Sequence, residues 1–184
     1  MVNYTYYLQL AIEAAKTHGV EAQFVDDMPQ SIRPTPVRGA FRMGEVLLPK
    51  NNPEEALFVL LHGLGHMAQW SLYPEEHERS YFYNARGNSW DDAHLREIWE
   101  HEFSALPFVL GFLNKHGLGD IEDWYVCHFM ADQQYLAEIF RNNQYDVQKF
   151  FMILSQTKVE ERFEAASFPM LAATFKAEGY IKFL

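Results

Sequence analysis

Two histidines spaced four residues apart, His62 and His66, are the residues in this sequence best suited to chemistry. On a helix, residues four apart project from one face, so both imidazoles can reach the same ion. Neutral imidazole is a common ligand of zinc. The alternative is that both are core histidines whose ring nitrogens are satisfied by backbone carbonyls. The segment around them favours the metal.

That segment predicts a buried helix with a sharp start. Asn52 is a favourable N-cap, Pro53 fits the first helical position, and Glu55 occupies the capping-box position. The residues that follow, ALFVLLHGLGHMAQW, are apolar on nearly every side, a pattern typical of buried helices. Buried polar groups are expensive unless they are paired or bound to a metal, so a metal site is expected here.

A carboxylate on a second predicted helix, Glu102, is the expected third ligand. This helix is predicted from residue 93 to about residue 115, and Glu102 interrupts its inward apolar face. Glu100 falls towards the polar side and His101 is rotated away, although Glu100 stays open as an alternative ligand. Two histidines and one glutamate, with one open position, form a known catalytic zinc set. The predicted cofactor is therefore Zn²⁺.

The remaining sequence predicts an α+β fold that is mostly helical. Further elements are expected as a helix over 4–18, a strand over 21–25, a hairpin over 38–48, a long loop over 71–89, and helices over 121–141, 147–154, 157–167 and from 169 to before 179. Pro107 is expected to kink or interrupt its helix. We expect residues 1–117 to form a metal-binding domain, and residues 118–184 to form a helical extension packed on it.

Composition excludes several classes of function. The net charge is −10, and no run of basic residues is present, so direct nucleic-acid binding is not expected. No apolar run approaches the roughly 18 residues of a membrane span, and the first residues lack the pattern of a signal peptide. The single cysteine, Cys127, cannot form an internal disulfide. A cytoplasmic protein is expected.

Two stretches carry a resemblance to a known family. The first is GEVLLPKNNPEEALFVLLHGLGHMAQW, and the second is EFSALPF, which runs from Glu102 to Phe108. Together they resemble the ImmA/IrrE family of HExxH zinc metallopeptidases, whose second motif is ExxAxxF, and the likeness covers roughly residues 4–116. It implies a small zincin-like domain with zinc held by His62, His66 and Glu102. Members of this family are associated with cleaving helix-turn-helix repressors, so a transcriptional regulator is an expected partner.

One residue departs from that family. The glutamate that follows the first histidine of HExxH is Gly63 here. In the family this glutamate is the general acid and base, a role worth typically about 10²–10⁴-fold in rate. Glycine cannot move a proton, so efficient peptide cleavage by the usual route is not expected.

Three hypotheses remain after this departure, and the sequence leaves open whether the protein is an enzyme. The first is a degenerate peptidase that binds zinc and acts through a partner protein. The second is an active zinc peptidase whose base comes from the loop after the metal helix, with candidates Glu75, Glu76, His77, Tyr81 and Tyr83. The third is a helical interaction module whose histidines are core residues. Substrate, partner and oligomeric state are not specified by the sequence.

Overall fold

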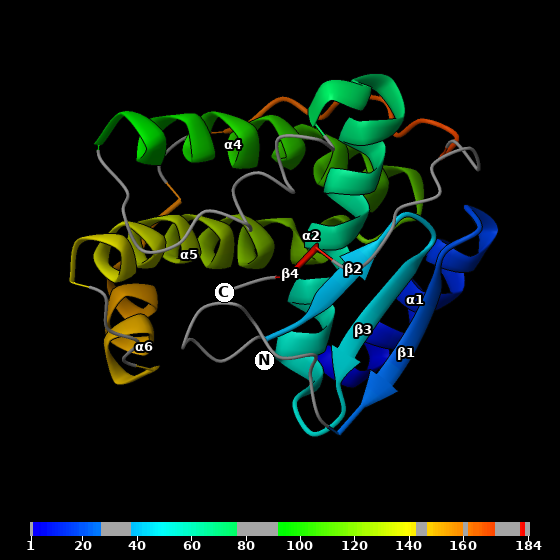
Figure 1. Cartoon of the computed structure of the whole chain (residues 1–184). Coiled ribbons are helices and arrows are strands. Elements are labelled where there is room, and N and C mark those ends of the chain that lie inside the picture. Colours follow the sequence, from blue (N-terminus) through cyan, green and yellow to red (C-terminus); the bar gives the residue numbers. More distant parts are fainter. Residues whose placement is uncertain are drawn as a thin grey trace.

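The computed structural model describes residues 2–26, 38–76, 92–142, 147–159, 162–171 and 181–182 of the chain. These form helices packed on one side of a small sheet (Figure 1). The elements are α1 (Tyr4–Thr17), β1 (Glu21–Val25), β2 (Ala40–Arg42), β3 (Glu45–Pro49), α2 (Pro53–Leu72), α4 (Asp92–Lys115), a 3-10 turn η1 (Gly119–Ile121), α5 (Glu122–Asn142), α6 (Val147–Gln156) and β4 (Ile181–Lys182).

The sheet has the strand order β1-β3-β2-β4. β1 pairs parallel with β3, and β2 and β3 form an antiparallel hairpin. The hairpin turns at Gly44, whose φ of 82° is a conformation that glycine adopts without steric cost. β4 pairs antiparallel with the other edge of β2. The hairpin places β2 beside the helix that carries both histidines.

The central element is α2, which packs against α1, the sheet and α4 (Figure 1). It begins as the sequence predicts, because the side chain of Asn52 accepts a hydrogen bond from the backbone N–H of Glu55 at 3.2 Å. Every residue from Ala56 to Trp70 is buried. A helix buried on all sides holds its side chains in fixed positions, which is what a metal site needs.

Most of the predicted elements are confirmed, including the first helix and strand, the hairpin, and the helices over 122–142 and 147–156. The coarse prediction of a mostly helical α+β fold is also confirmed. Pro107 does not interrupt its helix, since α4 continues to Lys115. The predicted loop starts later than expected, because α2 runs to Leu72 and residues 74–76 form one more helical turn. Its remaining residues up to 89 lie outside the described residues.

The prediction of a helix over 157–167 is wrong. Residues 157–159 and 162–171 contain no helix. The backbone N–H of Ala166 instead donates to the carbonyl of Pro107 at 2.9 Å, and the ring of Phe168 packs 5.1 Å from that of Phe112. This segment therefore crosses α4 and forms its bonds with that helix rather than within itself. The helix predicted from residue 169 is not formed over 169–171, and its other residues lie outside the described part; β4 was not predicted.

One buried cluster joins α1, the sheet, α2, α4 and α5. Tyr125, Val126 and Phe129 of α5 belong to it, so the helix after residue 117 packs on the part before it. The division into two domains at residue 117 stays a prediction.

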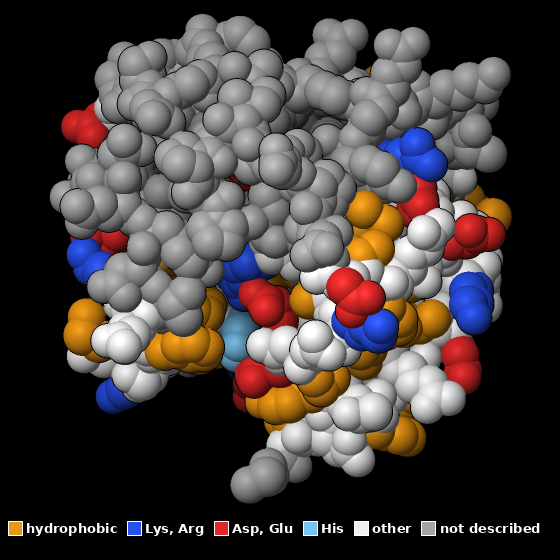
Figure 2. Space-filling view, turned by 60° about the horizontal axis from the view of Figure 1, so that its bottom comes forward, with side chains coloured by type: hydrophobic (Ala, Val, Ile, Leu, Met, Phe, Trp, Pro, Cys, Tyr) orange, Lys and Arg blue, Asp and Glu red, His pale blue; other side chains and the backbone are white. Residues whose placement is uncertain are grey.

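Acidic and basic side chains are interspersed on the coloured part of the face in Figure 2, where no broad blue area is visible. Among the described helices, none combines the length and apolar character required to cross a membrane.

Candidate metal centre

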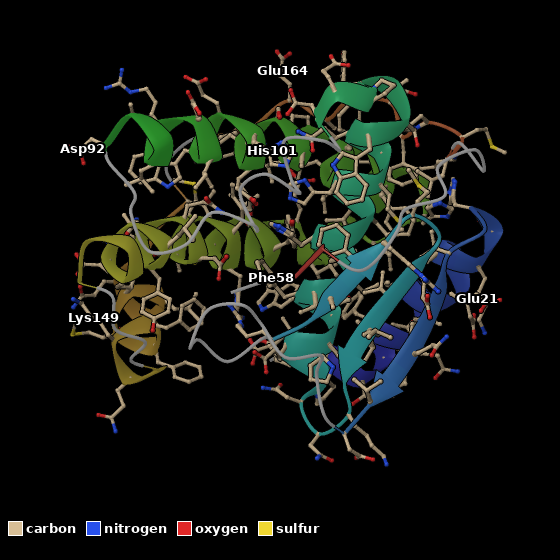
Figure 3. The ribbon with its side chains drawn as sticks, in the orientation of Figure 1. Glu21, Phe58, Asp92, His101, Lys149 and Glu164 are labelled. Atoms are coloured by element: carbon tan, nitrogen blue, oxygen red, sulfur yellow. The ribbon has the colours of Figure 1, made fainter. Side chains whose placement is uncertain are left out.

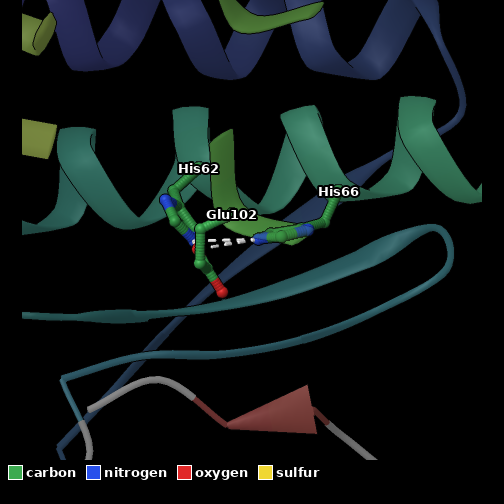
Figure 4. Close-up of side chains that lie close together, drawn as sticks. All are labelled: His62, His66 and Glu102. Atoms are coloured by element: carbon green, nitrogen blue, oxygen red, sulfur yellow. Dashed lines mark hydrogen bonds and ion pairs between the residues drawn. The ribbon is translucent and has the colours of Figure 1, made fainter. Parts of the chain in front are cut away.

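The structure brings together the three predicted ligands, His62, His66 and Glu102 (Figure 4). The Oε2 atom of Glu102 lies 3.0 Å from His62 Nε2 and 3.2 Å from His66 Nε2. The two Nε2 atoms are 3.0 Å apart. Both histidines are only 2% exposed, and Glu102 is partly buried. Three ligand atoms from two helices thus converge on one point.

This donor set fits zinc. In tetrahedral coordination with bonds of about 2.0–2.1 Å, neighbouring donor atoms lie roughly 3.3 Å apart. The three observed separations are each within a few tenths of an ångström of that value. His62, His66 and Glu102 would hold the ion, and a zinc ion there would supply Lewis-acid chemistry.

Close packing of α2 on α4 is what brings Glu102 to the histidines. At Gly65, a Cβ atom would lie 2.6 Å from Cγ2 of Val109 and 3.0 Å from the carbonyl oxygen of Ala105. The helices therefore approach more closely here than any side chain on Gly65 would permit. Glycine is unfavourable inside a helix, and the close approach of α4 explains why it stands at this position.

We expect Gly65→Ala to lower the free energy of unfolding by about 1–3 kcal/mol, because the added methyl group overpacks the α2–α4 contact. The loss is measured by urea denaturation. Gly119→Ala is the control, since a Cβ there meets its nearest neighbour, Asn114 Oδ1, at 3.9 Å rather than 2.6 Å. Equal stability of the two variants would contradict this account of the packing.

The electrostatics favour the metal-binding forms of Glu102 and His62, and the protonated form of His66. Burial alone would raise the pKa of the Glu102 carboxyl, but the neighbouring His66 and His62 outweigh burial and hold this pKa well below its usual range. Burial lowers the pKa of His62 to about 4. For His66 burial acts in the same direction, but Glu102 and Gln69 overcome it and raise its pKa. An ionised carboxylate and at least one neutral imidazole are therefore present at neutral pH.

Gln69 orients one of the ligands. Its Oε1 atom lies 2.8 Å from His66 Nδ1, so Nδ1 carries the proton and Nε2 is the atom turned to Glu102. The amide nitrogen of Gln69 donates to the carbonyl of His101 at 3.0 Å and to Ser104 Oγ at 2.6 Å. Gln69 is fully buried. A single amide thus fixes the tautomer of His66 and ties it to α4.

We expect Gln69→Leu to weaken zinc binding about 10–100-fold, since second-layer partners of metal-bound histidines have effects of this size. Competition with a chromogenic chelator measures the affinity. Gln133→Leu is the control, because Gln133 is a similarly buried glutamine on α5 whose Oε1 atom has no hydrogen-bond partner among the described residues. An affinity unchanged in Gln69→Leu would show that this amide does not orient His66.

His101 lies beside the three predicted ligands but does not belong to their cluster. Its ring stacks on that of His66, with 4.9 Å between the centroids, and its Nδ1 atom lies 2.7 Å from Oε2 of Glu76. Figure 3 shows His101 and Phe58 in the interior where α2, α4 and α5 meet, whereas Glu21, Asp92, Lys149 and Glu164 lie at the periphery. An imidazole with a carboxylate partner therefore stands next to the site.

Gly63 is covered by the sheet. A Cβ atom on Gly63 would lie 3.3 Å from Cγ of Phe41 and 3.4 Å from Cγ2 of Val46. The ring of Phe41 stacks on His66 at 5.7 Å and on Trp70 at 5.3 Å. The volume next to Gly63 is therefore filled by a phenylalanine that also packs on His66, one of the predicted ligands.

A buried ion pair borders the site on the side of α5. Arg38 Nη1 lies 2.6 Å from Asp132 Oδ1, and Arg38 Nε lies 2.7 Å from Glu55 Oε1. Burial raises the pKa of Asp132 to about 6 despite the arginine. The pKa of Tyr125 on the same helix is raised well above its usual range by burial and by the charges of Glu102 and Asp132, so its hydroxyl stays protonated.

Ionisation of Asp132 should lower stability as the pH rises. Its pKa in the folded chain is about 6 against an ordinary value of 3.8, so the folded state holds this proton more tightly than the unfolded state. Proton binding to Asp132 therefore contributes fully to the free energy of unfolding below about pH 4. This contribution is lost as the pH rises to about 6, and the change is at most about 3 kcal/mol. Asp132→Asn cannot titrate, so its free energy of unfolding relative to wild type should improve over this window.

The experiment compares urea denaturation of wild type and Asp132→Asn at several pH values. Asp123→Asn, an exposed substitution on the same helix, serves as the control and should show no such trend. A difference between wild type and Asp132→Asn that stays constant with pH would mean that Asp132 ionises normally.

Comparison with known proteins assigns no role to the residues of this site. No family model, curated protein or solved structure matches this chain. The resemblance to the ImmA/IrrE family therefore stays a prediction that depends on the motif residues.

Of the residues considered from the sequence, the structure groups His62, His66 and Glu102. Glu100 is exposed on the opposite side of α4 and is not in this cluster. Among the loop candidates, Glu76 contacts His101 and Glu75 is exposed, and the others lie outside the described residues. Sequence reasoning missed Gln69, although its position three residues after His66 and its polarity within an apolar helix were visible signals. It also missed Phe41, for which no local signal exists.

Proposed function

We propose that this protein is a zinc-binding, metallopeptidase-like protein of the ImmA/IrrE type that binds a partner protein instead of cleaving it. Zinc is held by His62, His66 and Glu102, and the site lacks the usual general base. A transcriptional regulator is the expected class of partner, by the resemblance of the two motifs. We further propose a cytoplasmic location, in keeping with a single, unpaired cysteine, Cys127.

One observation carries this proposal: the three ligand atoms converge while Gly63 is packed under Phe41. The ligand atoms lie within 4.8 Å of one another, at separations that suit zinc. A Cβ on Gly63 would already press on the ring of Phe41 at 3.3 Å. A glutamate at this position therefore requires the side chains of Phe41 and Val46 to shift, so a general base at position 63 conflicts with the packing of the sheet on α2.

The test measures metal content and hydrolysis on the same purified sample. We expect about one zinc ion per chain and no zinc-dependent hydrolysis of casein or of a fluorogenic peptide library. Absence of zinc would overturn the metal site. Hydrolysis that disappears in His62→Ala would overturn the degenerate assignment, because it would show that the metal centre is an active one.

A second candidate function is an active zinc peptidase whose base is supplied from another position. The observation in its favour is the pair of His101 and Glu76, since His101 stacks on His66 and its Nδ1 lies 2.7 Å from the carboxylate of Glu76. An imidazole oriented by a carboxylate is a common general base. If hydrolysis is found, His101→Gln should abolish it and leave the zinc content unchanged.

A further inference from the structure

A second pair of histidines joins the ends of two helices. His18 is the C-cap of α1, and His116 directly follows α4, which ends at Lys115. Their Nε2 atoms lie 3.0 Å apart. His18 is only 9% exposed, and His116 is half-buried. The proposed function makes no use of this pair, although two facing imidazoles are able to exchange protons near neutral pH.

The two rings meet head-on, as in a hydrogen bond, rather than at the angle adopted by two ligands of one ion. Their centroids are 5.2 Å apart, whereas those of His62 and His66 are 4.7 Å apart at the same Nε2 separation of 3.0 Å. Centroids lie farthest apart when both nitrogens are on the line between the rings, and this is the linear geometry that an N–H···N bond prefers. Rings that bind one tetrahedral ion converge at an angle instead. His18 and His116 therefore form an imidazole–imidazole hydrogen bond.

This bond needs at least one neutral ring. A neutral imidazole donates from one nitrogen and accepts at the other, whereas both nitrogens of an imidazolium donate. One added proton leaves the bond intact, because a protonated His116 can still donate to a neutral His18. A second proton places two N–H groups and two positive charges face to face across 3.0 Å. The doubly protonated pair must therefore separate.

The surroundings of the pair oppose both protons. Burial lowers the pKa of His18, and the charges of Lys115 and His116 lower it further. Burial and Lys115 also lower the pKa of His116. In the described part of the chain, no carboxylate is among the groups that shift either pKa, and the last turn of α1 adds another cation, Lys16. No described residue is hydrogen-bonded to the buried Nδ1 of His18, so a charged His18 would carry an unsatisfied donor.

The pair also supports the segment 162–171, which Figure 1 shows in orange along α4. The ring of Phe168 packs on His18 with 4.8 Å between centroids, and on Phe112 of α4 with 5.1 Å. Phe168 is buried and offers no negative charge to an imidazolium. Two residues earlier, the N–H of Ala166 donates to a carbonyl of α4 at 2.9 Å. Movement of His18 would therefore remove a packing partner from the residue that anchors this segment.

We propose that His18 and His116 form an acid-released latch, which fastens the end of α1 and the segment 162–171 to α4 at neutral pH and releases them when both rings are protonated. The open rings bind protons more tightly than the closed pair does. The stabilisation by the latch is therefore present above about pH 6.5, the ordinary histidine value, and is lost as the pH falls below it. The latch does not depend on zinc, so it goes beyond the proposed function.

Hydrogen exchange of the Ala166 amide measures release of the latch in the full chain, because this amide is bonded across to α4. The amide of Leu61, within the buried part of α2, is the reference for opening of the whole core. Between about pH 7 and about pH 4.5, the protection of Ala166 should fall at least about tenfold more than that of Leu61. An equal fall at both amides would overturn the latch, because it would show that acid opens the chain as a whole.

His116→Gln separates the latch from other effects of acid. Glutamine does not titrate and its amide can still donate to His18, so the protection of Ala166 relative to Leu61 should stay nearly constant with pH. His128→Gln is the matched control and should behave like wild type, since His128 is another buried histidine whose pKa is lowered by burial. An equal fall in wild type and in His116→Gln would overturn the proposal.

A direct measurement keeps the test decisive if His116→Gln does not fold. NMR of the ring nitrogens of wild type should show two coupled protonation steps for the pair, and Ala166 should lose protection with the second step. Two rings that titrate independently of each other would overturn the proposal. Titration with zinc tests for a metal between the rings, and a second ion per chain that shifts both ring signals would overturn the hydrogen-bonded latch.

Discussion

His62→Ala and Glu102→Ala are expected to reduce the zinc content of the purified protein from about one ion per chain to nearly none. Each variant removes one of three protein ligands, and a ligand matters more than a second-layer partner, whose loss already costs about 10–100-fold in affinity. Elemental analysis after dialysis measures the content. Wild type should also lose thermal stability when zinc is removed, because an ion at 100 times its dissociation constant stabilises the folded state by about 2.7 kcal/mol.

Glu100→Ala is the matched control for this experiment. Glu100 lies on the same helix two residues away and is exposed, whereas Glu102 is the carboxylate between the histidines. Glu100→Ala should therefore retain full zinc content and the same stabilisation by zinc. Loss of zinc in Glu100→Ala but not in Glu102→Ala would show that Glu100, and not Glu102, is the third ligand.

Gly63→Glu is expected to destabilise the protein and to leave it without peptidase activity. The glutamate must displace the ring of Phe41 and the side chain of Val46, which stand 3.3 and 3.4 Å from the position of a Cβ. Overpacking of this kind costs typically about 1–3 kcal/mol. Urea denaturation measures the loss, and hydrolysis of a fluorogenic peptide library in the presence of zinc measures activity.

The double variant Gly63→Glu, Phe41→Ala tests the cause. Phe41→Ala alone should cost about 3–5 kcal/mol as a large-to-small core substitution. If the two side chains compete for one volume, the double variant is more stable than the sum of the single losses predicts, by at least about 1 kcal/mol. Strict additivity would show that Phe41 is not what excludes a side chain at position 63.

The elements that hold the ligands were predictable because their signals are local. Asn52 and Pro53 mark the start of α2, and capping depends on hydrogen bonds within the first turn. The apolar character of α2 predicts its burial. Glu102 was identifiable because it interrupts an apolar face, and a carboxylate in such a place requires a partner.

The segment after α6 was not predictable for the opposite reason. Thr157 and Glu160 have the spacing of a capping box, yet residues 162–171 form no helix. Their conformation depends on contacts with α4, where the carbonyl of Pro107 accepts the N–H of Ala166 and Gly111 leaves room for the backbone of Ala166. A pattern within one segment contains no information about a surface formed by residues much earlier in the chain.

The packing around the ligands was only partly predictable. Gln69 follows His66 on the same helical face, so a polar residue in that place could have been read as a partner of the site. Phe41 lies on a strand, and nothing in its neighbourhood indicates that its ring covers Gly63. Long-range contacts of this kind depend on how the sheet and α2 are stacked, which the sequence pattern leaves open.

The burial of α2 from Ala56 to Trp70 has a consequence for how a bound metal ion would be exchanged. We expect backbone amides in the buried stretch Ala56–Trp70, which contains His62 and His66, to exchange slowly with solvent, because their exchange requires the core to open. Glu102 is the ligand with the greatest access to water. A zinc ion held at this site would therefore leave most easily by movement of this one carboxylate on α4, with the two histidines kept in place to receive the next ion.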